Sequence, residues 1–165
     1  MNTCYYSPVA FFSYFSAERS SNRASLQGQQ KNSIPKDATI LVVEDNVSNF
    51  VLIARMLGYL GIHCEWKTSG YEVVEYADTL PRLDLILLDI RLPYEDGFSA
   101  LRKIRSSTRL KDTLVVAITA EAGLEQMKRA QEAGFDGFLG KPLDPDRFPA
   151  QIRHILAGES IWEPS

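Results

Sequence analysis

From residue 39 onward, short apolar runs alternate with longer stretches in which apolar residues recur every three or four positions. Three of the runs are continuous and rich in branched aliphatic residues, which is typical of strands buried on both faces. Two further runs are shorter or interrupted by polar residues. The pattern therefore predicts five strands: TILVV at 39–43, IHCEW at 62–66, LILL at 85–88, LVVAI at 114–118 and DGFL at 136–139.

Helices are predicted between and after these strands. Residues 46–60 carry apolar positions at helical spacing, and Gly61 ends that run. Ser69 is a candidate cap for a helix that stops before Pro81. Asp144 and Pro145 are expected to start the last helix. One face of the third helix is marked by Phe98, Leu101 and Ile104, and a fourth helix that ends near Gly134 is indicated by Leu124, Met127 and Ala130. In the last helix, the positions expected to face inward are Phe148, Ile152 and Ile155.

The alternation of strand and helix predicts an α/β fold, with a parallel sheet covered by helices on both faces. With five strands and right-handed crossovers, we expect the flavodoxin-like order 2-1-3-4-5. The folded domain is expected to span residues 38–158. Residues 1–37 are expected to form an N-terminal tail or linker, and residues 159–165 a C-terminal tail.

Composition narrows the class of protein further. A chain of 165 residues with 45% apolar residues suits one domain with a sizeable core. The net charge of −3 gives no reason to expect nucleic-acid binding. Cys4 and Cys64 do not suggest a disulfide framework, so we expect a reducing, cytoplasmic setting. The sequence has no run of eighteen apolar residues, so no transmembrane segment is expected.

The first 37 residues have a different character from the rest. CYYSPVAFFSYFS at 4–16 is apolar but interrupted, and no basic residue precedes it as one would in a signal peptide. A polar, Ser- and Gln-rich stretch follows. We expect a disordered tail or an overextended gene start; the alternative is a segment that docks on a membrane surface or a partner.

Polar residues follow four of the five predicted strands. Glu44 and Asp45 follow the first strand, Asp89 the third, Thr119 the fourth and Lys141 the fifth. In the predicted order the first and third strands are neighbours, so their carboxyl ends bring the three acids together. Open α/β sheets bind ligands at this edge.

Three crowded carboxylates repel one another and therefore invite a cation. An all-oxygen site suits Mg²⁺, and Mn²⁺ can replace it. Together with Lys141, a divalent ion would balance the three negative charges. Asp89 can then act as a nucleophile toward a phosphoryl group and form an acyl phosphate. Lys141 would neutralise charge on the phosphoryl oxygens, and Thr119 could donate a hydrogen bond to one of them.

Four motifs in this order, ILVVEDN, LILLDIRLP..DG, AITAEAG and GFLGKPL, resemble the receiver domain of two-component response regulators, of the CheY-like type. The resemblance covers residues 38–158. Each motif alone is common, but four in the right order, each closing a strand, are specific. The acidic pair begins with Glu44 rather than Asp, which is a frequent variant in the family.

The resemblance implies a role for each matching residue. Asp89 would be the phosphoacceptor, and the backbone carbonyl of Arg91 would join Glu44, Asp45 and Asp89 as a Mg²⁺ ligand. Thr119 would be the switch hydroxyl, Phe138 the switch aromatic and Lys141 the phosphate-contacting lysine. The bond before Pro142 is often cis in this family.

The resemblance also implies a function. We expect a stand-alone, single-domain response regulator that takes its phosphoryl group from a sensor histidine kinase or a histidine phosphotransfer protein. It would act as a stoichiometric phosphoacceptor with self-limiting autodephosphorylation rather than as an enzyme. Its output is expected to run through protein contacts on the face formed by the fourth helix, fifth strand and fifth helix. No DNA-binding domain is expected, and whether the domain dimerises stays open.

Simpler interpretations exist for these residues. Asp89 could be a turn former, the acidic pair a helix N-terminal charge pair, Thr119 a helix cap, Lys141 a surface lysine and Phe138 plain core. His63 and His154 are expected to be structural or surface residues, and Cys64 to be core.

Three other functions compete with the phosphoacceptor hypothesis. They are a non-phosphorylated interaction module on the same fold, a flavin-binding protein and a haloacid-dehalogenase-like phosphatase. A flavin site would need a phosphate loop after the first strand, where acids stand instead. A haloacid dehalogenase would carry its nucleophile after the first strand rather than the third.

Overall fold

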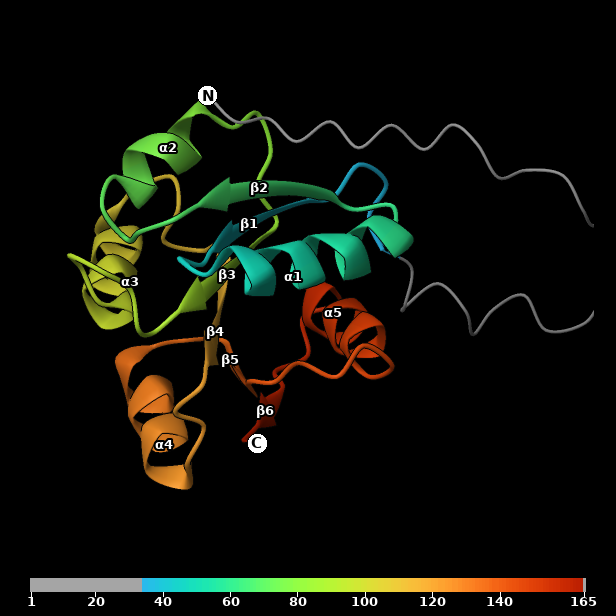
Figure 1. The fold of residues 1–165 in the computed structure, drawn as a ribbon. Coiled ribbons are helices and arrows are strands. Elements are labelled where there is room, and N and C mark those ends of the chain that lie inside the picture. Colours follow the sequence, from blue (N-terminus) through green and yellow to red (C-terminus); the bar gives the residue numbers. More distant parts are fainter. Residues whose placement is uncertain (1–33, 165) are drawn as a thin grey trace, which may run out of the picture.

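The apolar runs of the sequence form a single parallel sheet in the computed structural model, which describes residues 34–164 (Figure 1). The strand order is β2-β1-β3-β4-β5-β6, and every neighbouring pair is parallel. The predicted α/β class and the order of the first five strands are confirmed. The strands are β1 (Thr39–Val43), β2 (His63–Lys67), β3 (Leu85–Asp89), β4 (Leu114–Thr119), β5 (Gly137–Gly140) and β6 (Trp162–Glu163).

The prediction of five strands was wrong by one, because β6 adds a sixth at the open edge of β5. It lies within residues 159–165, which were expected to be a tail. Gly158 adopts a left-handed backbone (φ +87°), and the chain then returns along the sheet. A strand of two residues is too short to show the period-two alternation that identifies strands in a sequence.

Helices cover both faces of the sheet and enclose two hydrophobic cores (Figure 1). Helices α1 and α5 pack on one face, and α2, α3 and α4 on the other. Successive strand residues alternate between the two cores, as Ile40 and Leu41 do in β1. The helices are α1 (Val47–Tyr59), α2 (Val73–Thr79), α3 (Gly97–Ser106), α4 (Leu124–Ala133) and α5 (Phe148–Leu156).

Two helix starts differ from those expected. Helix α2 begins at Val73, and Ser69 does not cap it, because Glu72 directly before the helix takes a left-handed backbone (φ +57°). Asp144 opens a turn whose backbone bonds lead into α5, so the helix itself begins later, at Phe148. Both differences arise from turns whose residues also suit helix starts.

The predicted limits of the domain remain a prediction. Ile34, inside the predicted N-terminal tail, packs against the core on the α1 and α5 side. Residues 1–33 of that tail lie outside the described residues. In residues 34–164, no helix is both long and apolar enough to cross a bilayer.

The topology also determines where a site can form. Strand β1 pairs with β2 on one side and with β3 on the other, so the order in which strands are added to the sheet reverses at β1. The carboxyl ends of β1, β3, β4 and β5 all lie at the same end of the sheet. Open α/β sheets bind ligands beyond the carboxyl ends of their strands.

Candidate functional site

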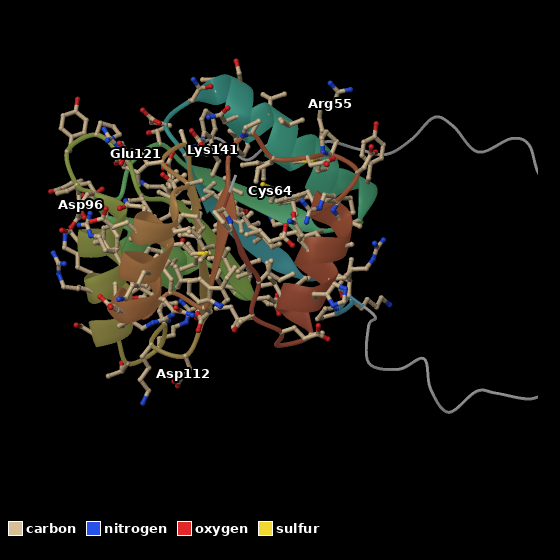
Figure 2. The ribbon with its side chains drawn as sticks, turned by 90° about the horizontal axis from the view of Figure 1, so that it is seen from below. Arg55, Cys64, Asp96, Asp112, Glu121 and Lys141 are labelled. Atoms are coloured by element: carbon tan, nitrogen blue, oxygen red, sulfur yellow. The ribbon has the colours of Figure 1, made fainter. Side chains whose placement is uncertain are left out.

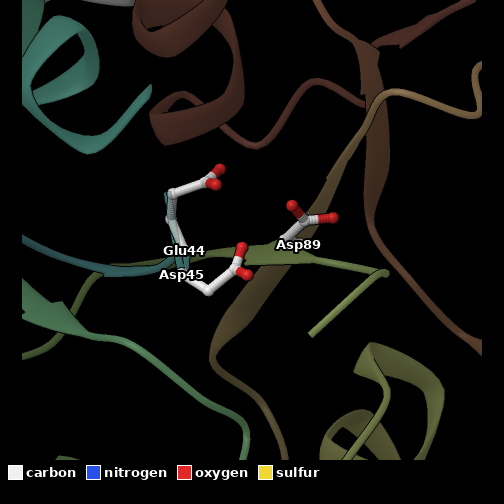
Figure 3. A group of neighbouring side chains, drawn as sticks. All are labelled: Glu44, Asp45 and Asp89. Atoms are coloured by element: carbon white, nitrogen blue, oxygen red, sulfur yellow. The ribbon is translucent and has the colours of Figure 1, made fainter. Parts of the chain in front are cut away.

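Three carboxylates meet at the carboxyl ends of β1 and β3 (Figure 3). Glu44 and Asp45 follow β1 directly, and Asp89 is the last residue of β3. One oxygen from each carboxylate lies within 4.8 Å of the others. Glu44 is 0% and Asp89 4% exposed, whereas Asp45 is exposed. The sequence predicted this cluster because neighbouring parallel strands end at the same edge.

Glu44 is held in place from several directions. Its Oε1 accepts hydrogen bonds from the backbone N–H of Asn46 (3.1 Å) and from Nδ2 of Asn49 (3.1 Å). Its backbone carbonyl accepts a bond from the indole Nε1 of Trp66 (2.8 Å). The Trp66 ring stacks on Phe50, with 4.2 Å between ring centroids. These contacts orient a fully buried carboxylate that would otherwise be costly to bury.

Lys141 connects the two buried acids. It follows β5, and its Nζ lies 2.6 Å from Oε2 of Glu44 and 2.5 Å from Oδ2 of Asp89. The other oxygen of Asp89 accepts a bond from the backbone N–H of Arg91 (2.8 Å). With its side chain only 11% exposed, Lys141 is not the solvated surface lysine of the simpler interpretation.

Burial and ion pairing shift the pKa values of both Asp89 and Lys141. Burial raises the pKa of Asp89, and the hydrogen bond and charge of Lys141 only partly offset it. For Lys141, burial alone would lower the pKa, but the bonds and charges of Asp89 and Glu44 outweigh it, so the pKa is raised. Lys141 therefore stays charged at neutral pH.

The cluster fits a divalent cation. Glu44, Asp45 and Asp89 bring three negative charges against the single positive charge of Lys141. Among residues 34–164, the Asp45 carboxylate has no hydrogen-bond or ion-pair partner. Hard oxygen donors with a residual charge of −2 suit Mg²⁺ or Mn²⁺. For Arg91, the structure places the backbone N–H on Asp89, and the role of its carbonyl stays a prediction.

Thr119 and Phe138 are both fully buried. Thr119 ends β4, and its Oγ1 accepts a bond from the backbone N–H of Glu121 (3.2 Å). It does not cap α4, whose N-cap is Gly123. Phe138 lies in the core on the α3 and α4 side. This position suits plain core packing as well as a switch aromatic, so its predicted role stays a prediction.

Other predicted features lie around the cluster. The Lys141–Pro142 peptide bond, the candidate cis bond, is cis. Figure 2 shows Lys141 and Glu121 at the end of the sheet opposite Asp112, which precedes β4. At the rim, Arg91 and Glu121 form an ion pair between the loops that follow β3 and β4. Both of these side chains are exposed, so solvent screens the pair.

Sequence reasoning missed Asn49 and Trp66 as residues that position the site. Trp66 lies in β2, which the expected strand order already placed beside β1, so its place near that strand's carboxyl end was a usable signal. No such signal marked Asn49, because a single polar residue near the start of a helix is ordinary.

The histidines and the described cysteine lie outside the cluster. His63 is at the amino end of β2 and pairs with Glu65 (2.6 Å), while His154 in α5 pairs with Glu159 (2.8 Å). Cys64 is half-buried and packs against the core on the α1 and α5 side. These positions fit structural rather than chemical roles.

Comparisons with known protein sequences find a family match and several relatives. The response regulator receiver domain family matches residues 40–153. The signal transduction histidine-protein kinase BarA of Escherichia coli (strain K12) is 37% identical over 123 residues, which are 74% of this chain and 13% of the kinase. Hybrid signal transduction histidine kinase G of Dictyostelium discoideum is 40% identical over 111 residues, or 66% of this chain and 3% of that protein. The chain thus spans only a small part of the length of these curated relatives.

Solved structures show the same similarity. One is the receiver domain of sensor histidine kinase PA1611 from Pseudomonas aeruginosa PAO1, which has a magnesium ion coordinated in its active site cleft. It is 33% identical with a TM-score of 0.66, and the match covers 75% of this chain and all of that one. Chemotaxis response regulator CheY4 of Vibrio cholerae is 25% identical with a TM-score of 0.67, covering 73% and 99% of the two chains.

Proposed function

Because the chain belongs to the response regulator receiver domain family of two-component systems, we propose that Asp89 accepts a phosphoryl group from a phosphohistidine. The observation that carries this assignment is the position of Asp89. It ends a buried strand, lies beside Glu44 and Asp45, and contacts Lys141 through one carboxylate oxygen. The Asp89 carboxylate is therefore shielded from bulk water, whereas the neighbouring carboxylate of Asp45 is exposed to it.

In the proposed reaction, a carboxylate oxygen of Asp89 forms a bond to phosphorus while the phosphorus–nitrogen bond of the donor breaks. The product is an acyl phosphate on Asp89, and the released imidazole takes up a proton. Bound Mg²⁺, or Mn²⁺ in its place, would neutralise charge on the phosphoryl oxygens. Glu44, Asp45, Asp89 and the backbone carbonyl of Arg91 are the groups that would hold the ion.

The remaining residues act on the transferred group. Lys141 would exchange its contact with Asp89 for one with a phosphoryl oxygen, and the Thr119 hydroxyl would donate a hydrogen bond to another. We infer that this movement shifts Phe138 and changes the face formed by α4, β5 and α5, where a downstream protein would bind. Hydrolysis of the acyl phosphate ends the signal, so the domain is a stoichiometric acceptor and not an enzyme with a free substrate.

The donor would be a sensor histidine kinase or a histidine phosphotransfer protein. The curated relatives that support this donor class are themselves histidine kinases. In this proposal the protein functions as a stand-alone regulator in the cytoplasm. It signals through protein contacts and does not bind DNA directly. The alternative is an interaction module on the same fold that is never phosphorylated.

The test is the intact mass of the protein after incubation with acetyl phosphate and Mg²⁺. We expect wild type to gain one phosphoryl group, Asp89→Asn to gain none, and chelation of the metal to prevent the gain. Asp112→Asn is the matched control, because Asp112 is exposed and lies at the opposite end of the sheet (Figure 2). Equal phosphorylation of wild type and Asp89→Asn would refute the assignment of the acceptor. No gain in any protein, with no Mg²⁺ binding, would favour the interaction module.

A further inference from the structure

The segment after α5 folds back and lies along β5 (Figure 1). The helix ends at Leu156, and the backbone N–H groups of Gly158 and Glu159 bond to carbonyls of its last turn. Residues 160–163 then run along the open edge of β5 and include β6. We call residues 160–163 the C-terminal strap.

The backbone contact between the strap and β5 is close, but it involves few residues. The N–H of Phe138 donates to the carbonyl of Ile161 at 2.7 Å. A side chain at Gly137 would not fit, because its Cβ would lie 2.9 Å from the same carbonyl oxygen. Two residue pairs align between β5 and β6, against four between β4 and β5. The edge thus accepts an extended chain closely, although this strap pairs with only two of the four residues of β5.

Side chains of the strap contact both faces of the sheet. Ile161 packs against the core on the α1 and α5 side, and Trp162 against the core on the α3 and α4 side. Both remain half-buried. Two side chains donate hydrogen bonds to Oε2 of Glu163. They are Arg147, directly before α5, through Nη2 (2.6 Å), and Gln151, within α5, through Nε2 (2.7 Å). The edge therefore selects bulky apolar side chains followed by a carboxylate.

The fit between the strap and α5 is incomplete. A groove of about 500 Å³ lies between them, lined on the helix side by Ala150, Gln151 and His154. The Arg147 side chain is 63% exposed, so solvent screens its ion pair with Glu163. Few backbone bonds, half-buried anchors and a screened ion pair describe an element of low local stability.

We propose that the β5 edge is a docking site for an extended segment of a partner protein, and that the strap fills this site in cis until the partner displaces it. The partner segment would add a parallel strand to β5, with a bulky apolar residue at the place of Trp162 and an acidic residue at that of Glu163. Main-chain bonds supply affinity in such strand addition, and the side-chain pockets supply specificity. The strap competes well because its tether gives it a high effective concentration. The β5 edge belongs to the face formed by α4, β5 and α5, so the choice of a downstream protein as partner rests on the proposed function, whereas strand addition itself does not require that Asp89 be phosphorylated.

Amide hydrogen exchange tests whether the strap opens. The Phe138 amide faces the strap, whereas those of Asp136 and Lys141 bond to the carbonyls of Val115 and Thr119, at 2.8 Å each. We expect Phe138 to exchange at least about tenfold faster than these two amides, since only strap opening exposes it. Equal protection of all three would show that β6 is a permanent strand and would overturn the proposal.

A labelled peptide of residues 159–165, ESIWEPS, tests whether the edge binds a strand in trans. We expect at least about tenfold tighter binding to a Trp162→Ala, Glu163→Ala double variant than to wild type, because the variant strap competes less well. Glu159→Ala is the control within the segment. Its side chain contacts His154 rather than β5 or Arg147, so peptide affinity should match that of wild type. Equal affinity for the double variant and wild type would overturn the proposal.

A charge exchange tests the acidic position. The peptide carrying Glu163→Lys should lose affinity for the double variant, and adding Arg147→Glu to that protein should restore it. If the altered peptide bound with undiminished affinity, the proposed contact between Arg147 and the acidic residue would be refuted. A wild-type dimer whose Phe138 amide stays protected would mean that the strap exchanges between two copies, and would overturn the assignment to a partner's segment.

Discussion

Replacing Lys141 by Met should reveal how strongly two buried acids, Glu44 and Asp89, depend on the one cationic side chain that contacts them within residues 34–164. Nζ of Lys141 contacts both Glu44 and Asp89, which are 0% and 4% exposed. Methionine keeps an unbranched side chain of similar volume but has no charge. The substitution therefore leaves two adjacent carboxylates uncompensated, and packing changes little.

Two costs determine the expected decrease in the free energy of unfolding: that of breaking a buried ion pair and that of protonating a carboxyl group. Breaking a buried ion pair by removing one partner costs about 3–5 kcal/mol. The folded variant can escape part of this cost by protonating one carboxyl group. At pH 7 that protonation costs about 4 kcal/mol for a group with a pKa near 4, because each pKa unit is worth about 1.4 kcal/mol. We therefore expect the unfolding free energy at pH 7, without divalent cations, to fall by about 3–4 kcal/mol.

The dependence on pH follows from the same reasoning. In the variant, a carboxyl group of the folded protein has a raised pKa, so the folded state binds a proton more tightly than the unfolded state. Stability is then recovered as the pH falls from 7 toward 5, by up to about 1.4 kcal/mol per pH unit. Millimolar Mg²⁺ should also recover stability, and more so in Lys141→Met than in wild type, because the variant site is more negative.

Urea unfolding followed by circular dichroism, at several pH values and with or without Mg²⁺, measures these changes. Lys128→Met is the control, since Lys128 makes an exposed ion pair with Glu132 and its loss should not change the midpoint measurably. A loss below about 1 kcal/mol for Lys141→Met, or one that does not vary with pH, would refute the reasoning.

Three further substitutions test other parts of the fold. Asp84 accepts bonds from an arginine and from the first backbone N–H of β1; burial raises its pKa, but these bonds outweigh burial and lower it. Asp84→Asn should therefore cost about 1–2 kcal/mol at pH 7 in urea unfolding, and the difference from wild type should shrink as the pH falls below about 4, where the unfolded carboxyl takes up its proton. A constant difference down to pH 2 would contradict the charge argument. Gly97→Ala should destabilise by about 2 kcal/mol or more, because its Cβ would lie 2.5 Å from the backbone oxygen of Asp89; an unchanged thermal midpoint would show that the loop gives way freely. Arg105→Ala removes bonds to the carbonyl of Gly134 and to two other carbonyls, so a loss of about 2 kcal/mol and faster amide exchange at the end of α4 are expected, whereas normal exchange there would argue against this cap.

The sequence could predict the cluster of acids because its causes are short in range. An apolar run that ends in Asp89, and another followed by Glu44 and Asp45, indicate two strands with acids at their carboxyl ends. The alternation of strands with helices then places those ends at one edge. The place of Lys141 followed in the same way from the run before it.

Details that depend on contacts between distant segments were not predictable in this way. The indole of Trp66 bonds the carbonyl of Glu44, 22 residues away in the chain. The expected strand order places Trp66 near the end of β1, but it does not indicate that the indole bonds this carbonyl. Likewise Lys141 bonds both Glu44 and Asp89 at once, which requires the actual spacing of β1, β3 and β5.

By itself, then, the sequence determined the alternation of elements, the edge at which the polar residues gather and the identity of the acids. Those features follow from hydrophobic burial and from the period of each element. Only the tertiary structure decided that Trp162 and Glu163 add a sixth strand. Two residues carry too little periodicity to predict a strand, and the open edge of β5 that pairs with them exists only once the sheet has formed.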